Sequence, residues 1–397
     1  MAALSHLTIL DLTHMLSGPY AGMLLADMGA RTIKVEPLDG EGTRKLLADS
    51  PDYSINGMGA YFLTLNRNKE SVCLDLKKPE GLALFHELVK KADVVINNFS
   101  RGVPQRLGID YEALAAINPR IITCSITGFG ETGPDPDRPA FDLVAQGMGG
   151  GMSITGEEGG TPTRAGIPIG DLGGGLFATI GILSALNARS ESGVGRHVDI
   201  SMQDCQLSLL NYMATMHLMS GIVPQAAGNG HFVHVPYNTF RTQTRWIIVA
   251  CLGDNFFANL VEMFGDERLR NPEFKTQPGR WANRHLINQV VQENFEKNSC
   301  EFWLEELRKF RIPSAPVNDF GHAFSDPQAL ARNMVVEVPL DGGGSVRQPG
   351  NPVKLGDDDT AFSAPPSLGR DTETVLRDWL GISGEALAAL RSAAVIK

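Results

Sequence analysis

One carboxylate stands just before a run of glycines in the stretch IPIGDLGGGLFATIGILSAL, residues 167–186. Asp171 precedes Gly173, Gly174 and Gly175, at the start of a segment apolar enough to form a buried helix. Such an acid can cap the helix, because its oxygens accept hydrogen bonds from the first free amides. It can also be a nucleophile that a large substrate approaches closely, since glycine leaves the approach unobstructed. The local sequence allows both roles.

Other polar and aromatic residues follow apolar runs elsewhere in the first half of the chain. His14 follows one run, Lys77 follows another, and the stretch NNFSRGVPQRLG at 97–108 follows a third. Each of these residues could be an ordinary turn or surface residue. Together they supply amides, an aromatic ring and guanidinium groups, which would suit an adenine nucleotide with its phosphates.

Composition and motifs exclude several classes of protein. The net charge of -10 argues against a general nucleic-acid binder, which would present a basic face. No G-x-G-x-x-G follows the first strand, so a nicotinamide cofactor is a secondary possibility, and P-loop, H-E-x-x-H and G-x-S-x-G motifs are missing. The five cysteines are widely spaced, without zinc spacing, and indicate buried free thiols. With neither a signal peptide nor an uninterrupted apolar run of membrane length, we expect a cytoplasmic protein without a bound metal.

Short β-rich runs alternate with helical stretches, which is typical of a parallel sheet covered by helices. We expect a doubly wound, Rossmann-like α/β fold whose ligands gather at the carboxyl ends of the strands. The predicted helices include 19–29, 79–92 and 176–190. The predicted strands span 7–12, 31–36, 71–76, 93–98, 120–126 and 197–202.

The length of 397 residues favours two domains. We expect a large Rossmann-like domain at 1–205, a linker helix at 206–224 and a smaller α/β domain at 225–322. Residues 323–397, with a hairpin around DGGGSVRQPGNPVKL and a terminal helix at TETVLRDWLGI, should fold back onto the large domain.

Several motifs in order give the chain a resemblance to a known family. LDLTHMLSGPYAGMLLADMGARTIKVE, NRNKESVCLDLK, NNFSRGVPQRLG, NPRIITCSITGFGETGP, AFDLVAQGMGG, IGDLGGG and GRHVDISMQD span most of residues 5–205. Weaker similarity in VPYNTF, PSAPV and PGNPVKL extends this to nearly the whole chain. The chain resembles the family III coenzyme A transferases, the CaiB/BaiF family.

The resemblance implies roles for particular residues. Asp171 would attack the donor thioester and carry coenzyme A (CoA) as a covalent aspartyl intermediate, and no tightly bound cofactor would be needed. A position at a helix start should keep this carboxylate ionised. Phe141 and Asp142 would lie beside it. The implied coenzyme contacts are Leu16, Ser17, Leu74, Lys77, Asn98, Phe99, Ser100 and Arg106.

The chain departs from the formyl-CoA transferase pattern at three places. Pro37 stands where that enzyme has a basic residue, so Lys34 or Arg44 is expected to contact phosphate instead. Leu16 replaces a Gln, and GNGHFVH at 228–234 takes the place of a run of four glycines.

The resemblance leaves the reaction and its partners partly open. A racemase in this family carries a His where this chain has Phe141, and a phenyl ring cannot carry a proton, although His14 could in principle substitute. Racemase activity, or CoA binding without turnover, remains the alternative to CoA transfer. The acceptor should be a small carboxylic acid, with a short dicarboxylate favoured, and an interlocked homodimer is implied. A second carboxylate could be met by Arg164, His231 or His234.

Overall fold

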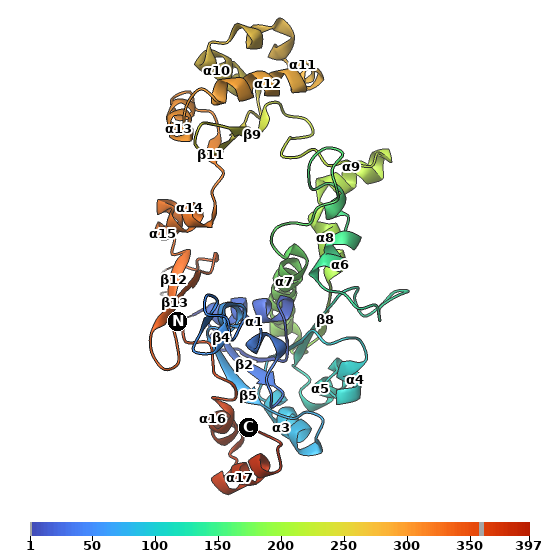
Figure 1. Ribbon diagram of the computed structural model, residues 1–397. Coiled ribbons are helices and arrows are strands. Elements are labelled where there is room, and N and C mark those ends of the chain that lie inside the picture. The colour runs from blue at the N-terminus through green and yellow to red at the C-terminus, as the bar shows by residue number, and fades with distance from the viewer. Residues whose placement is uncertain (1, 357–360) are drawn as a thin grey trace. The chain divides into compact units, whose positions relative to one another are not determined.

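The computed structural model describes residues 2–356 and 361–397 (Figure 1). The chain divides into two compact units. The large unit comprises Met1–Gly151, Ala165–Thr215 and Leu330–Lys397, and the small unit comprises Met152–Arg164 and Met216–Ala329. The sequence-based boundaries leave 152–164 within the large domain, whereas the structure groups this segment with the small unit. One contact that holds it there is the hydrogen bond from the Gly228 amide to the Gly156 carbonyl, 2.9 Å long.

A six-stranded parallel sheet forms the centre of the large unit. Its order, β5-β2-β1-β6-β7-β8, reverses direction between β1 and β6, which is where doubly wound sheets bind their ligands. The predicted α/β fold is confirmed. The strands are β1 (Thr8–Asp11), β2 (Arg31–Glu36), β5 (Lys69–Cys73), β6 (Val94–Asn97), β7 (Ile122–Thr127) and β8 (His197–Ser201).

Helices cover both faces of this sheet, because its central strands are apolar on both sides. Leu10 and Val95 pack with Phe85 on one face, and Ile9 and Ile96 pack with the other helices on the opposite face. The helices of the large unit are α1 (Ser17–Asp27), α2 (Ala60–Leu65), α3 (Pro79–Val89), α4 (Val103–Leu107), α5 (Tyr111–Ile117), α6 (Asp142–Met148), α7 (Ile169–Ser192), α8 (Met202–Leu209), α16 (Thr372–Leu380) and α17 (Gly384–Ser392).

The last part of the chain returns to the sheet. Val375 and Leu387 enter the same core as β5, and Leu74 forms a bridge with Ile396. The Thr372 hydroxyl accepts a hydrogen bond from the Cys73 amide at 3.1 Å. The hairpin expected from the glycine-rich stretch is formed by β12 (Val335–Pro339) and β13 (Ser345–Pro349), and a short ribbon pairs β3 (Ser54–Ile55) with β4 (Met58–Gly59).

By length and composition, α7 could cross a membrane, although its sequence has no uninterrupted apolar run of that length. In the structure, Ala178, Ile182 and Ala185 are fully buried in the core of the large unit. One face of α7 therefore packs into the core of the large unit.

The small unit is built on a three-stranded antiparallel sheet in the order β11-β10-β9. An aromatic core that includes Phe240, Phe295 and Trp303 packs its helices on the sheet. The elements are β9 (Tyr237–Arg241), β10 (Trp246–Ala250), β11 (Ser314–Pro316), α10 (Asp254–Phe264), α11 (Gln277–Ala282), α12 (Arg284–Phe295), α13 (Cys300–Lys309) and α14 (Phe320–Ser325), while α9 (Tyr212–Ser220) and α15 (Pro327–Ala331) lie at the unit boundaries.

Candidate active site

Asp171 lies in the first turn of α7, but it does not cap that helix. The N-cap position belongs to Pro168, which has no side-chain hydrogen bond to give. Asp142, at the start of α6, supplies the cap: its Oδ1 accepts from the Gly170 amide at 2.8 Å and from the Asp171 amide at 3.3 Å. Asp171 is therefore freed from the capping role that its position suggested.

Two glutamines hold this arrangement in place. Gln146 donates from Nε2 to the second oxygen of Asp142 at 2.8 Å, and its Oε1 accepts from the Ala165 amide at 2.9 Å. Gln206 on α8 donates to the carbonyl of Ile169 at 3.0 Å. The start of α7 is thus tied to α6 and α8. No sequence pattern indicated either glutamine as a site residue.

Burial and a neighbouring charge raise the pKa of Asp171. Removal from water is the larger cause, and the Asp142 carboxylate adds to it, so the pKa is raised to about 6. The helix start was expected to favour the ionised form. The structure gives the opposite shift, and the two amides described above are hydrogen-bonded to Asp142. At pH 7 a group with this pKa is still ionised in about nine molecules of ten.

Besides Asp142, Tyr61 on α2 is a titratable residue that interacts with the Asp171 carboxylate. The sequence analysis did not identify it. Burial raises the pKa of Tyr61 to about 12, and the Asp171 carboxylate contributes to the shift. The phenol therefore stays protonated at neutral pH, so it can donate a hydrogen bond as well as accept one.

The three glycines after Asp171 serve packing rather than substrate access. A Cβ on Gly175 would lie 2.6 Å from the carbonyl oxygen of Ser17, and one on Gly174 would lie 2.6 Å from the Ser17 hydroxyl. A Cβ on Gly173 would meet Gln206 and Leu209 at 3.3 Å. The glycines let α7 approach α1 and α8 closely, which corrects the expectation that they leave room for a substrate.

The loops after β1 and β6 meet at the reversal point of the sheet. Asn98 accepts from the His14 amide at 3.0 Å and donates to the His14 carbonyl at 2.7 Å. Phe99 lies beside the His14 ring, with centroids 5.9 Å apart. Burial lowers the pKa of His14. Two of the expected coenzyme contacts, Asn98 and Phe99, are thereby placed together.

The remaining expected contacts differ in their accessibility. Ser17 is buried, and its Oγ has no hydrogen-bond partner among the described residues. Leu74 is buried in the core, so its side chain is unavailable to a ligand. Lys77, Ser100 and Arg106 are exposed, and Leu16 is half-buried.

Lys34 and Arg44 do not offer free charge to a phosphate. Lys34 is fully buried and donates to the Thr13 carbonyl at 2.8 Å. Arg44 makes two hydrogen bonds of 2.7 Å to the Glu36 carboxylate. The expectation that either residue replaces the missing basic residue at Pro37 is wrong, because both cations are already used inside the fold.

Phe141 and the two histidines have contrasting environments. Phe141 directly precedes the capping Asp142 and is 70% exposed. In the small unit, the rings of His231 and His234 lie 4.7 Å apart, and His231 Nδ1 accepts from the amides of Val233 and His234. Burial, with a contribution from His234, lowers the pKa of His231. His231 is therefore a poor cation for a second carboxylate, while Arg164 is an exposed residue of the small unit.

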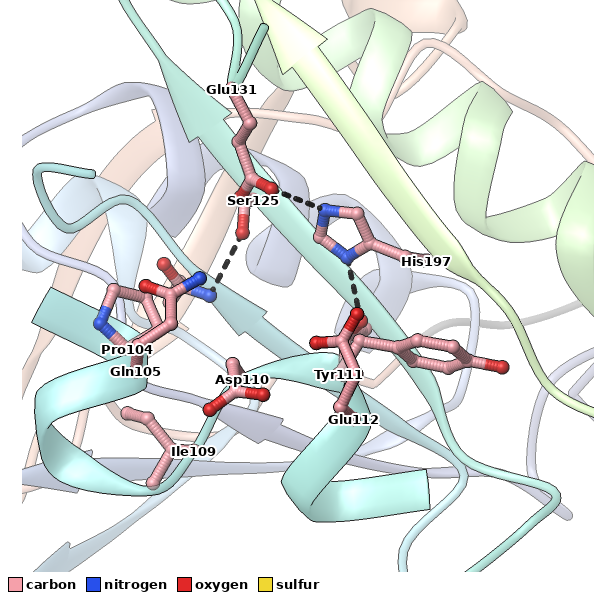
Figure 2. Close-up of a pocket in the computed structure, with 11 residues that line it drawn as sticks. Pro104, Gln105, Ile109, Asp110, Tyr111, Glu112, Ser125, Glu131 and His197 are labelled. Carbon is pink, nitrogen blue, oxygen red and sulfur yellow. Dashed lines mark hydrogen bonds and ion pairs between the residues drawn. The ribbon is translucent and has the colours of Figure 1, made fainter. Parts of the chain in front are cut away.

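A separate polar pocket of about 130 Å³ lies against β7 and β8 (Figure 2). His197 pairs with Glu131, with 3.2 Å between Nε2 and the carboxylate, and its Nδ1 lies 2.7 Å from the Thr123 hydroxyl. The Glu131 amide also donates to Asp199 at 3.0 Å. These contacts hold Glu131, in the segment after β7, against β8. The same segment continues to Phe141 and Asp142.

Residues 2–356 and 361–397 contain no cluster of three His, Cys, Asp or Glu side chains able to hold a metal ion. The five cysteines are free and buried, as the sequence indicated. Removal from water raises the pKa of Cys205, the cysteine on α8, to about 11, so this thiol is protonated.

Comparison with known proteins assigns the chain to a family. The model of CoA-transferase family III matches residues 4–372. The chain belongs to CoA-transferase family III. It is thus a CoA-transferase, an enzyme that moves CoA between acids, and the resemblance seen in the motifs is confirmed.

Curated relatives cover nearly the full chain. The acetyl-CoA:oxalate CoA-transferase of Acetobacter aceti is 39% identical over 90% of this chain and 90% of its own length. The succinate–glutarate CoA-transferase of Agrobacterium fabrum is 36% identical over 94% of this chain and 95% of its own. Among solved structures, a CaiB/BaiF family protein from Brucella suis superposes with a TM-score of 0.86 at 36% identity, covering 95% of this CoA-transferase and 99% of the Brucella chain.

Proposed function

We propose that this CoA-transferase moves CoA from an acyl-CoA thioester to a small carboxylic acid, with dicarboxylates included, through a covalent intermediate on Asp171. The proposal rests on the desolvation and ionisation of that carboxylate. It is partly desolvated, which strengthens it as a nucleophile, yet it is ionised at neutral pH, and its helix is held by a separate cap. Relatives that act on oxalate, succinate and glutarate support the acid class.

The exchange proceeds in balanced steps. A carboxylate oxygen of Asp171 attacks the thioester carbonyl, the carbon–sulfur bond breaks, and the CoA thiolate leaves a mixed anhydride. The thiolate then attacks the aspartyl carbonyl and expels the donor acid, which gives an aspartyl-CoA thioester. The acceptor carboxylate repeats both steps in reverse and leaves with CoA, so Asp171 is regenerated. No proton or tightly bound cofactor is consumed.

Exposed apolar side chains support a homodimer, which we propose to be interlocked, with each site shared between the large domain of one chain and the small domain of its partner. Soluble monomers rarely expose contiguous apolar patches of large size. Light scattering should give the mass of a dimer. The large apolar side chains exposed on α6, α7 and α8 are Leu143, Val144, Met148, Leu176, Ile180, Leu207 and Leu209.

The proposed setting is the cytoplasm, with neither nucleic acid nor membrane as a partner. The buried free thiols suit a reducing compartment, and the acidic net charge disfavours nucleic acid.

Mass spectrometry tests the reaction directly. The wild-type enzyme is incubated with acetyl-CoA, formyl-CoA or succinyl-CoA and with oxalate, succinate or glutarate, and new thioesters are identified. A quenched sample should contain a peptide that includes residues 167–186 and carries CoA as a thioester on Asp171, with its mass increased by CoA less one water. Asp171→Ala should abolish transfer, and full activity in that variant would sink the mechanism.

The alternatives have their own signatures. Deuterium entering the α-carbon of a 2-methylacyl-CoA in heavy water would indicate a racemase. Coenzyme binding without turnover of any thioester would indicate a binding protein.

A further inference from the structure

An apolar cavity of about 320 Å³ lies within the large unit, beside the start of α7. It is lined by α1 and α2, by the first turn of α7 and by residues 349–352 at the end of β13. A pocket of this size is large enough for a small organic ligand. Its aliphatic lining consists of Leu16, Met23, Leu24, Leu65, Ile167 and Leu172.

The cavity is lined by residues that flank Asp171 at the start of α7. Pro168 and Leu172 both line it, three positions before and one position after Asp171. Tyr61 lines the cavity as well, and its phenol responds electrostatically to the Asp171 carboxylate. An acyl group bonded to Asp171 therefore has this cavity within reach of its chain.

The lining offers no free cation. Arg67 is the one charged residue among the residues that line the cavity, all of which the structure describes. Its guanidinium bonds Asp27 at 2.8 Å and also donates to Gln348 and to the Pro349 carbonyl. A second carboxylate placed in the cavity would be desolvated without a compensating charge.

We infer that the donor is an acyl-CoA with an apolar chain longer than acetyl, and that this chain occupies the cavity during transfer. The inference rests on the proposed function of Asp171. A dicarboxylate acceptor reaches the same carboxylate without entering the cavity, because its second charge is excluded from the aliphatic lining.

A series of acyl-CoA donors tests the effect of acyl-chain length. With oxalate as fixed acceptor, kcat/KM is measured for acetyl-, butyryl-, hexanoyl- and octanoyl-CoA. Each methylene that is buried should raise kcat/KM by about fourfold until the cavity is full. Values that stay level or fall from acetyl-CoA onward would overturn the inference.

The charge argument has a matched pair of donors. Butyryl-CoA and succinyl-CoA have chains of equal length, and only the second ends in a carboxylate. Butyryl-CoA should be the better donor, and a clear preference for succinyl-CoA would contradict the inference.

A variant that fills the cavity tests whether the dependence on acyl-chain length arises there. Ile167 is 55% exposed at the cavity, so Ile167→Trp should fold and should flatten the dependence on chain length. Val194 is 53% exposed after α7 and does not line the cavity, so Val194→Trp should keep the dependence. An unchanged dependence in Ile167→Trp argues against this cavity as the acyl site.

Binding measurements distinguish the proposed acyl site in the cavity from the proposed transfer reaction at Asp171. Dissociation constants of the same acyl-CoA series are measured with Asp171→Ala, which cannot form the intermediate. Affinity that increases with chain length supports the cavity even if the wild type transfers nothing, in which case only the proposed function fails. Affinity independent of chain length, together with normal transfer by the wild type, overturns the cavity alone.

Discussion

The Asp142 carboxylate caps the helix that carries Asp171, accepting hydrogen bonds from the amides of Gly170 and of Asp171 itself. One acid thus positions another and also raises its pKa. The backbone of Asp171 is held in place by these bonds, while its side chain is not used for capping.

The acidic side of the profile of kcat/KM against pH, its acid limb, should follow the ionisation of Asp171. Attack requires the carboxylate, and its pKa is about 6, so kcat/KM should rise with pH and level off above that value. Asp142→Asn removes the neighbouring charge and should move the limb to lower pH. Asp204→Asn, on α8, is the control and should leave the limb in place. A limb that does not move in Asp142→Asn would show that burial alone sets the pKa.

The same substitution should cost stability. An asparagine oxygen can still accept from the Gly170 amide, but its amide nitrogen would face the donating Nε2 of Gln146. We expect a loss of about 1 to 3 kcal/mol in the free energy of unfolding, measured in urea.

Gln146→Glu would present a second carboxylate to Asp142. It should therefore lower the free energy of unfolding more at pH 8 than at pH 4.

Stability should fall as pH rises through the range in which Asp171 ionises. Its folded pKa of about 6 is above the ordinary value of 3.8, so the native state binds the proton more tightly than the unfolded chain does. The stabilisation is complete below about pH 4 and is lost as pH passes 6, with a difference of up to about 3 kcal/mol. Asp171→Asn should therefore raise the urea midpoint at pH 8 and have little effect near pH 4. An equal effect at both pH values would refute the linkage.

The close approach of α7 to α1 predicts that Gly175 cannot be enlarged. Gly175→Ala would place a methyl group 2.6 Å from a backbone oxygen, which has no rotamer to adopt in response. We expect a loss of about 1 to 3 kcal/mol despite the better helix propensity of alanine, seen as a lower melting temperature. Gly166→Ala, with nothing within 4 Å, is the control and should be nearly neutral.

Arg44 should matter for folding, and Arg106 for the coenzyme. Arg44→Met removes the paired cation and its two hydrogen bonds from the buried Glu36 carboxylate and should cost about 3 to 5 kcal/mol of stability, with the KM of the folded enzyme for acyl-CoA unchanged. Arg106→Met removes an exposed cation at a family contact position and should raise that KM about tenfold without changing unfolding. If Arg44→Met raises the KM while stability holds, our assignment of Arg44 to the fold is wrong.

Much of the fold could be predicted from local patterns. The parallel strands were found within a few residues because each is an apolar run bounded by turn residues, and β2 at Arg31–Glu36 coincides with its predicted range. The start of α7 was placed seven residues late, since Gly173, Gly174 and Gly175 weaken any local helix signal and only packing against α1 explains them.

The sequence by itself determined the sheet and the family, and it singled out Asp171 as the candidate carboxylate, because periodicity and ordered motifs are properties of the chain read locally. Tertiary structure decided what surrounds that carboxylate. Whether Lys34 meets a phosphate or the Thr13 carbonyl, and whether Asp171 or Asp142 caps α7, depends on which groups the fold brings within 3 Å of one another. Hydrogen bonding and desolvation act over such distances in space, and spacing along the chain does not encode them.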